Sequence, residues 1–318
     1  MMRDASPGTG RGSRGLALIV VLWGVALLTL LAAGFSFSMR TEAQLAFASL
    51  ERARAAAAAE AGVRRLLAFL ADSDPRRFEA VDLSMRFDDI DVGLHMVPET
   101  SRVDLNAAPG RLIEGLIARV SASSEVAVSA TAVADAILDW RDTDSVARPN
   151  GAEIAEYQAA GRDYGPRNGA FLSVSELSRV MGVPPALYEA LAPLLSVYAW
   201  SPRVDAMTAP RDVLLAVPGL SESRVDEFMQ RRSEPGPDAR RAFALLAGSE
   251  RYLAHGGSGG VFSLSARATM PSGVQAARRA VVKVTGGAAR PIAILAWFEE
   301  LPRDLATLPA TADAAKAN

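Results

Sequence analysis

Cysteine is absent from the sequence, and histidine is almost absent, with 2 residues in 318. Without cysteine the chain can form neither a disulfide framework nor a thiolate metal site. The two histidines, His95 and His255, lie far apart in the sequence, which disfavours a histidine-based zinc site. Neither sign of charge dominates, because the formal net charge is −2, so the chain as a whole lacks the basic excess that holds a polyanion.

The common catalytic motifs are also missing. No G-x-S-x-G elbow lies between a predicted strand and a predicted helix. The glycines at residues 8–12 precede the first apolar segment instead of following a strand, and Gly256–Gly260 lacks the Lys-Ser/Thr pair of a phosphate-binding loop. The sequence leaves open a serine triad assembled from distant residues. We predict that the protein is not an enzyme.

One long apolar run is the strongest feature that is present. Between Leu16 and Met39 the chain carries no charged residue, and a helix of that length crosses a hydrocarbon core of about 30 Å. Apolar residues continue at helical spacing to about Ala71, without a proline. We predict one continuous helix of roughly 55 residues, with a transmembrane part at residues 16–39 and an extramembrane continuation at residues 40–72.

A polar leader, residues 1–15, precedes this run and carries Arg3, Arg11 and Arg14. The run is longer than the ~7–15 apolar residues of a secretory signal peptide, so we expect an anchor that is kept. Three arginines also follow the run closely, so the count of positive charges on its two sides is tied. A short leader before a large folded part favours a cytoplasmic amino terminus.

The remainder of the chain predicts an α+β fold. Residues 73–102 begin a β domain with one candidate strand, and residues 260–301 close it with three more. Two helical units lie between these segments, at residues 103–199 and residues 203–252. The tail, residues 302–318, is rich in Ala and Thr and is predicted to be disordered.

Four carboxylates lie close together in the first helical unit, those of Asp139, Asp142, Asp144 and Glu153. Ca²⁺ takes about 6–8 oxygen ligands, which loop carboxylates and backbone carbonyls can supply. The spacing differs from that of an EF-hand, because the glutamate comes too late and the turn glycine is missing. Two interpretations stay open, a calcium site or solvated acids of which one caps a turn.

Residues 215–229 resemble a helix-hairpin-helix, and residues 180–191 resemble it more weakly. In DNA-binding hairpins, backbone N–H groups at a helix amino terminus meet a phosphate. Both hairpins here lack the second glycine that allows close approach, and the arginines at 231, 232, 240 and 241 are surrounded by acids. We favour a helical packing unit without nucleic acid, and keep a membrane-anchored DNA-binding protein of a DNA-uptake system as the alternative.

The amino terminus resembles that of type IV pilins and pseudopilins, in which a basic leader ends in glycine before an apolar helix. Here Arg14-Gly15 is followed by Leu16-Ala17-Leu18-Ile19-Val20. Most such proteins carry glutamate where this chain has Val20, and in that departure it resembles the K-type minor pseudopilins of type II secretion. Three further segments are similar to that family: the D-L-N-x-A motif in Val103–Pro109, the D-W-x-D-x-D…G-A-E…Y run in Ala136–Tyr157, and the F-x-S-x-x-E-L…G stretch in Phe171–Gly182.

The resemblance implies a pilin-like fold, with a long amino-terminal helix, an antiparallel β-sheet domain and a large inserted helical domain of the SAM-like or helix-hairpin-helix-like type. It also implies that a prepilin peptidase cuts between Gly15 and Leu16 and methylates Leu16. The family is similar in binding calcium within its helical insertion, for which the four carboxylates are the candidates.

The implied function is that of a minor pseudopilin at the tip of the periplasmic pseudopilus of the type II secretion system, taking part in protein export across the outer membrane. The implied partners are the other minor pseudopilins, of the I- and J-types. The implied location is the bacterial inner membrane, crossed once, with the carboxyl-terminal domain in the periplasm.

Overall fold

The computed structural model describes residues 13–71, 80–124, 126–234, 241–256, 260–285 and 292–299. Two compact units make up the chain, Met1–Arg54 and Ala55–Asn318. Most of the leader and the tail predicted to be disordered lie outside the described residues.

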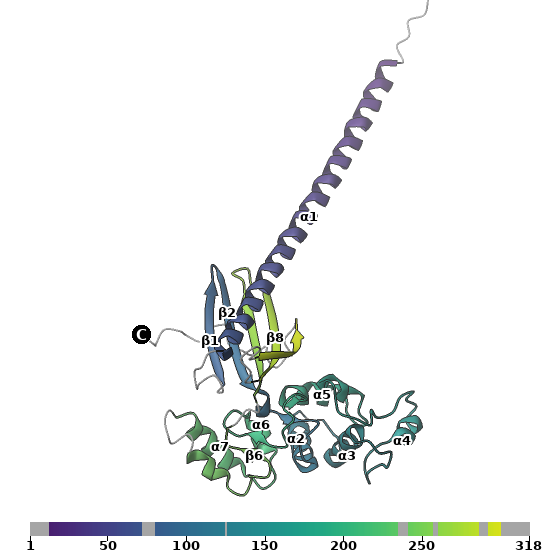
Figure 1. Ribbon diagram of the computed structural model, residues 1–318. Coiled ribbons are helices and arrows are strands. Elements are labelled where there is room, and N and C mark those ends of the chain that lie inside the picture. Colours follow the sequence, from purple (N-terminus) through teal and green to yellow (C-terminus); the bar gives the residue numbers. More distant parts are fainter. Residues whose placement is uncertain are drawn as a thin grey trace, which may run out of the picture. The chain divides into compact units, whose positions relative to one another are not determined.

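Helix α1 (Ser13–Ala71) is one uninterrupted helix of 59 residues, as the apolar periodicity predicts (Figure 1). It begins at Ser13, inside the predicted leader, so the end of the leader is not the start of the helix. From Leu16 to Met39 every side chain is exposed, on all faces of the helix. A helix that is apolar all round is suited to lipid, and α1 is long and apolar enough to cross a membrane.

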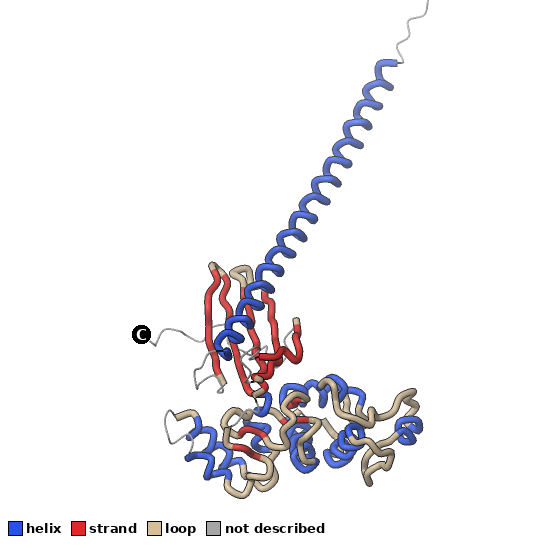
Figure 2. Tube along the Cα trace, in the orientation of Figure 1, coloured by secondary structure: helices blue, strands red, loops and turns tan. Residues whose placement is uncertain are grey.

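The second unit contains a five-stranded antiparallel sheet with the strand order β1-β2-β7-β8-β9 (Figure 2). Its strands are β1 (Val81–Phe87), β2 (Ile90–Pro98), β7 (Val261–Thr269), β8 (Gln275–Val284) and β9 (Ile292–Phe298). The last four confirm the predicted strands, of which the first was expected at residues 90–97. Strand β1 was not among the predicted strands, because most of its side chains are exposed and it shows no clean apolar alternation.

One face of the sheet packs on the last part of α1, whose buried residues are small near Ala55 and Ala59 and larger near Leu66 and Leu70. Gly62 marks the closest approach, since a Cβ there would lie 2.7 Å from Leu94 Cδ2. The run of alanines therefore serves close packing of helix on sheet, as small side chains let the two backbones approach.

The sequence between β2 and β7 forms the helical insertion, which has one continuous apolar core. Its helices are η2 (Glu99–Ser101), α2 (Gly110–Ser123), α3 (Ala130–Arg141), α4 (Ile154–Ala159), η3 (Val174–Arg179), α5 (Pro185–Leu191), η4 (Ala192–Leu194), α6 (Arg211–Leu215), α7 (Glu222–Arg232) and η5 (Ala242–Leu246). Four short strands accompany them, β3 (Val103–Asp104), β4 (Leu195–Ser196), β5 (Val204–Asp205) and β6 (Leu253–Ala254). The sequence analysis expected helices alone here, because a two-residue strand leaves no periodic pattern.

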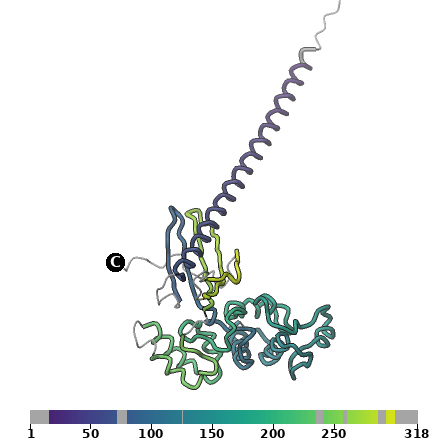
Figure 3. The backbone as a smooth tube through the Cα atoms, viewed as in Figure 1, coloured from purple at the N-terminus to yellow at the C-terminus, as the bar shows by residue number. Residues whose placement is uncertain are grey.

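The insertion consists of two modules, residues 103–200 and residues 203–256 (Figure 3), which share a common series of elements to which the first module adds α4, α5 and η4. Each begins with a Val-Asp strand, continues with a helix whose N-cap is a proline and then a helix whose N-cap is a serine, and contains a later 3-10 helix. Each ends with a strand that pairs in parallel with the first one, β4 with β3 and β6 with β5. The insertion is therefore an internal structural repeat.

The same polar framework closes each module. In the first, Arg141 donates to the carbonyl oxygens of Leu105 (2.6 Å) and Ala108 (2.9 Å). In the second, Arg232 donates to the carbonyl oxygens at residues 206 (2.7 Å) and 209 (2.8 Å), the corresponding positions. Burial lowers the pKa of both arginines, and the nearby Asp104 or Asp205 opposes that shift.

A buried ionic cluster joins the insertion to the sheet. Glu99, fully buried in η2, accepts from Arg102 (3.0 Å) and Arg279 (3.3 Å), and also from the hydroxyl groups of Ser196 (2.5 Å) and Ser263. Burial by itself would raise the pKa of Glu99, but the two guanidinium groups hold that pKa below its ordinary value. Ser263 alternates with the apolar residues Phe262 and Leu264 of β7, and it is buried by this contact.

Candidate metal centre and processing site

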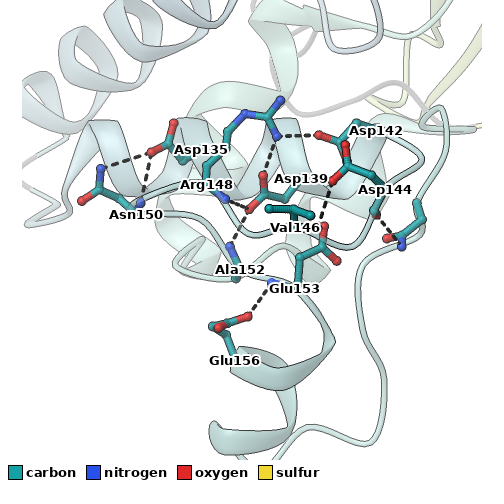
Figure 4. Close-up of polar contacts among 11 residues, drawn as sticks. Asp135, Asp139, Asp142, Asp144, Val146, Arg148, Asn150, Ala152, Glu153 and Glu156 are labelled. Carbon is teal, nitrogen blue, oxygen red and sulfur yellow. Dashed lines mark hydrogen bonds and ion pairs between the residues drawn. The ribbon is translucent and has the colours of Figure 1, made fainter.

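The acidic loop, which we define as residues 142–153, connects α3 to α4. Asp139 lies in the last turn of α3, Asp142 is its C-cap, and Glu153 is the N-cap of α4. The carboxylates of Asp142, Asp144 and Glu153 converge, with one oxygen of each within 4.8 Å of the others (Figure 4). The structure thus brings together three of the four acids that the sequence singled out.

Glu153 is the most unusual of the three carboxylates. It is buried, and neither of its carboxylate oxygens has a hydrogen-bond partner in the described part of the chain. Burial raises the pKa of Glu153, and the negative charges of Asp139, Asp142 and Asp144 raise it further. A buried carboxylate without a donor and beside other acids is unfavourable, and a bound cation removes that penalty.

The other two carboxylates are partly engaged. Asp142 accepts from Arg148 through Oδ2 (2.5 Å), while its buried Oδ1 has no partner among the described residues. Asp144 is exposed and accepts from the backbone N–H of Val146 through Oδ1 (2.9 Å). The oxygens without partners are hard donors, which suit Ca²⁺ better than a metal that prefers nitrogen or sulfur.

Asp139 is outside this converging group. Its two oxygens accept from the Arg148 guanidinium (2.5 Å) and from the backbone N–H groups of Arg148 (3.2 Å) and Ala152 (2.9 Å). A Cβ on Gly151 would lie 1.9 Å from Asp139 Oδ2, so only glycine fits there. Asp139 therefore holds the loop in shape, and the structure does not place it as a metal ligand. Arg148, which pairs with Asp139, is nine residues away in the sequence, and the spacing of the acids did not predict this pair.

Aromatic residues of the matched motifs hold both ends of the acidic loop. Trp140 stacks on Phe171 with ring centroids 6.0 Å apart and lies 6.2 Å from Tyr157. The Tyr157 hydroxyl accepts from the backbone N–H of Met181 (2.9 Å), and burial raises its pKa to about 12. These aromatic side chains are core residues that position the loop.

The asparagine of the D-L-N-x-A motif has a similar role. Asn106 donates to the Phe171 carbonyl (3.0 Å) and accepts from the Phe171 N–H (2.7 Å). Through these two bonds the Asn106 side chain pairs with the Phe171 backbone as a neighbouring strand would. The motif residues are thus explained by packing of the first module.

Both residues of the predicted processing site lie at the start of α1. Gly15 and Leu16 fall in its first turns, and the Leu16 side chain is 70% exposed. Residues 1–12 of the leader lie outside the described residues. Cleavage between Gly15 and Leu16 stays a prediction.

The second module contains the predicted hairpin, α6 and α7, joined through Gly219 at φ +85°. Its arginines have intramolecular partners. Arg211 pairs with Glu222 and Asp226, each at 2.7 Å, and Arg224 donates to the Leu245 carbonyl (2.9 Å). The hairpin packs within the module, and these contacts leave the DNA-binding alternative without support from the described arginines.

The repeat itself was visible in the sequence and was missed. The pattern R-V-D-x-x-x-A-P occurs at residues 102–109 and again at residues 203–210. A search for internal similarity before any motif would have found it. The aspartates of this pattern, Asp104 and Asp205, lie in the first strand of each module.

Comparisons with known proteins agree with this architecture. A family model described as type II secretion system (T2SS), protein K matches residues 99–200. The chain is also similar to one in the crystal structure of the GspK-GspI-GspJ complex from the enterotoxigenic Escherichia coli type 2 secretion system. That similarity has a TM-score of 0.59 at 17% sequence identity, and covers 82% of this chain and 99% of the other. No curated protein matches the sequence.

The two similarities carry different weight. At 17% identity, the structural one shows a shared fold, which is pilin-like. The family match falls on the first module, where the acidic loop and the motif residues lie. The first module is thus similar to type II secretion system protein K, and the chain shares the fold of the solved structure.

Proposed function

We propose that this chain is a minor pseudopilin of the type II secretion system protein K family, which caps the tip of the periplasmic pseudopilus and takes part in protein export across the outer membrane. The insertion of both helical modules between β2 and β7 carries the proposal. A pilus grows by stacking similar long helices, and an insertion of this bulk on the sheet domain would collide with a subunit placed above it. The topmost subunit has no such constraint. The proposed role is structural and not catalytic.

The amino-terminal helix supports the same position. Val20 stands where most pseudopilins carry a glutamate that is thought to neutralise a neighbour's terminal amine. A carboxylate in hydrocarbon is costly unless a partner is supplied. A subunit with no neighbour above it meets no such amine. In that subunit a valine avoids the free-energy cost of an unpaired carboxylate in the membrane.

The proposed partners are I- and J-type minor pseudopilins, because the similar chain of known structure comes from a complex with GspI and GspJ. The proposed location is the inner membrane, with α1 as the single anchor and the second unit in the periplasm. Affinity capture of the full chain from detergent-extracted membranes, followed by mass spectrometry, should recover both partner types. Capture of nucleic acid or of DNA-uptake proteins instead would favour the alternative function.

Copy number tests the tip position directly. A cap is expected at about one copy per pseudopilus, which quantitative mass spectrometry of sheared pseudopili measures against the major subunit. Many copies per fibre would refute the tip position and leave family membership intact.

We also propose processing by a prepilin peptidase between Gly15 and Leu16, with methylation of the new terminus at Leu16. The basic leader that ends in glycine before the apolar run supports it. Amino-terminal sequencing of the mature protein decides the matter. An intact leader, or cleavage beyond residue 30, would contradict it.

Finally, we propose that the acidic loop binds Ca²⁺ through Asp142, Asp144 and Glu153. The carboxylate oxygens without partners support this ligand set. Asp139, with Arg148, would position the loop without touching the ion. The bound ion would add positive charge to that of the Arg148 guanidinium, which pairs with Asp139 and Asp142.

A further inference from the structure

The side chain of Asn168 reaches the acidic loop from another segment of the first module, the connection between α4 and η3. Its Nδ2 donates to the backbone carbonyl of Asp144 (3.0 Å). Its Oδ1 is bonded to the same carbon as Nδ2, so this oxygen also lies at the acidic loop. Oδ1 is buried and has no hydrogen-bond partner among the residues that the structure describes.

The hydrogen bond to Asp144 decides which end of the amide is left without a partner. With the amide turned over, Oδ1 would face the Asp144 carbonyl oxygen, and two acceptors would meet without a proton between them. The nitrogen therefore faces the carbonyl, and the oxygen is left unsatisfied, which is unfavourable for a buried acceptor. Both oxygens of Glu153 and Oδ1 of Asp142 have the same deficiency, so unsatisfied acceptors from two segments lie at the acidic loop.

The framework of the first module holds Asn168 in this position. Its backbone is left-handed, with φ of +50°, a conformation that asparagine adopts several-fold more often than most residues. The next residue, Gly169, donates its backbone N–H to the Trp140 carbonyl (3.4 Å). Trp140 in turn stacks on Phe171, with ring centroids 6.0 Å apart. These contacts attach the segment that carries Asn168 to the end of α3, where the acidic loop begins.

The three converging carboxylates alone leave a calcium ion short of ligands. Of their six oxygens, Oδ2 of Asp142 is engaged by Arg148. Oδ1 of Asp144 accepts from the Val146 N–H. Removing these two leaves four oxygens, whereas Ca²⁺ takes about 6–8. An amide oxygen is an ordinary calcium ligand, and it adds no negative charge to a site where the acids already repel one another.

We propose that Asn168 is a further ligand of the calcium ion, which it binds through Oδ1 as a neutral addition to the three carboxylates. The inference rests on the proposed calcium binding of the acidic loop. It goes beyond that proposal because it adds a ligand from outside the loop. The bound ion would therefore join the segment before η3 to the acidic loop.

Asn168→Gly removes the amide and leaves the left-handed backbone without strain. Calorimetric titration of the full chain in detergent should show calcium binding at least about 10-fold weaker than in the wild type, since losing even a group that only orients a ligand costs about 10–100-fold. Asn150→Ala is the matched control. The Asn150 amide also holds the acidic loop, by donating to Oδ2 of Asp135 (3.2 Å), but Asn150 is exposed. This variant should bind calcium as the wild type does.

Asn168→Asp separates the oxygen of the amide from its nitrogen. Aspartate keeps an oxygen in the place of Oδ1 and tolerates a left-handed backbone, but it cannot donate to the Asp144 carbonyl. In chelator this variant should melt below the wild type, because it adds a fourth carboxylate to the three that converge. It should nevertheless bind calcium at least about 10-fold more tightly than Asn168→Gly, because it keeps the ligand oxygen.

Binding by Asn168→Asp that is as weak as binding by Asn168→Gly overturns the inference, because the lost bond to Asp144 then explains both. An equal loss in Asn150→Ala overturns it as well. If Asn168→Gly does not fold, Asn168→Asp is compared with the wild type, and a 10-fold loss there overturns the inference. A wild-type chain that binds no calcium refutes the proposed calcium site together with this inference, whereas binding that is insensitive to Asn168→Gly refutes this inference alone.

Discussion

The two helical modules share a framework, yet among the described residues a group of converging carboxylates occurs in the first alone. In the first module residues 142–173 separate α3 from η3, and in the second residues 233–241 separate α7 from η5. The longer connection leaves the framework unchanged, since the arginine bonds to backbone carbonyls are 2.6 and 2.9 Å in one module and 2.7 and 2.8 Å in the other. The framework supplies stability, and the loop that it carries is free to supply a binding site.

The comparison predicts large and similar losses of stability when either framework arginine is removed. Arg141→Met and Arg232→Met each leave two carbonyl oxygens without their donor. At about 1–3 kcal/mol for each buried unsatisfied group, we expect each substitution to lower the free energy of unfolding by about 2–5 kcal/mol. Urea denaturation of the full chain in detergent, followed by circular dichroism, measures this.

Arg231→Met is the control, because Arg231 is exposed and pairs with Glu227 in its own helix. Such an exposed pair contributes little to stability. A large loss for Arg141→Met alongside no loss for Arg232→Met would show that the two frameworks are not equivalent.

Calcium should stabilise the first module alone. At a free concentration of about 100 times Kd, a cation that binds only the folded state adds about 2.7 kcal/mol. We therefore expect the full chain to melt several degrees higher in calcium than in chelator. Replacing Asp142 and Asp144 by Ala should abolish that difference, because it removes two of the three converging carboxylates.

The second module provides the matched control. Replacing Glu222 and Asp226 by Ala removes the same charge, but from acids that already pair with Arg211. This variant should respond to calcium as the wild type does. Equal responses of all three proteins would mean that the acidic loop is only solvated.

The raised pKa of Glu153 gives a pH dependence with a definite sign. A carboxyl group whose pKa is raised on folding contributes stability below its unfolded pKa of about 4.3, and that contribution is lost as the pH rises through the folded pKa. In chelator, the Tm of the wild type relative to Glu153→Gln should therefore fall as the pH rises above about 4.3. Saturating calcium should reverse the difference near neutral pH. A difference that does not change with pH would mean that Glu153 is as well solvated as in the unfolded chain.

Features that depend on residues close together along the chain could be predicted from the sequence. The long helix and the strands β2, β7 and β9 follow from apolar runs and alternation, which depend only on neighbouring residues. The three converging acids were likewise among those predicted, because they lie close together along the chain.

Other features depend on contacts between distant residues. In the sequence Asp139 cannot be told apart from the other acids near the acidic loop. Its role differs because its carboxylate accepts from the Arg148 guanidinium and from the Ala152 N–H. Ser263 alternates as an exposed residue would, and Glu99 buries it from elsewhere in the chain. Periodicity carries no information on such pairs, so they required the structure.

The smallest predicted effects come from two left-handed residues, Trp200 and Gly256, whose backbone N–H groups donate to Asp104 and Asp205. Gly256→Ala puts a Cβ on a left-handed residue with φ of +69°, where no atom would lie within 4 Å of it. The change therefore tests the backbone alone. The left-handed conformation costs an alanine about 1–2 kcal/mol, and the loss of glycine's freedom in the unfolded chain returns about 0.5–1 kcal/mol, so we expect a net loss of about 1 kcal/mol.

Trp200→Gly puts a glycine on a left-handed residue of the first module, where φ is +49°. It relieves the strain and adds unfolded-chain entropy, so a small net gain of about 0.5–1 kcal/mol is expected, with opposite sign to Gly256→Ala. Urea denaturation of both variants against the wild type measures the pair. If Trp200→Gly is instead destabilising by more than about 1 kcal/mol, the indole packs against the chain after all, because losing an exposed ring cannot cost that much. Opposite signs would show that the backbone is strained at Trp200 and is not strained at Gly256.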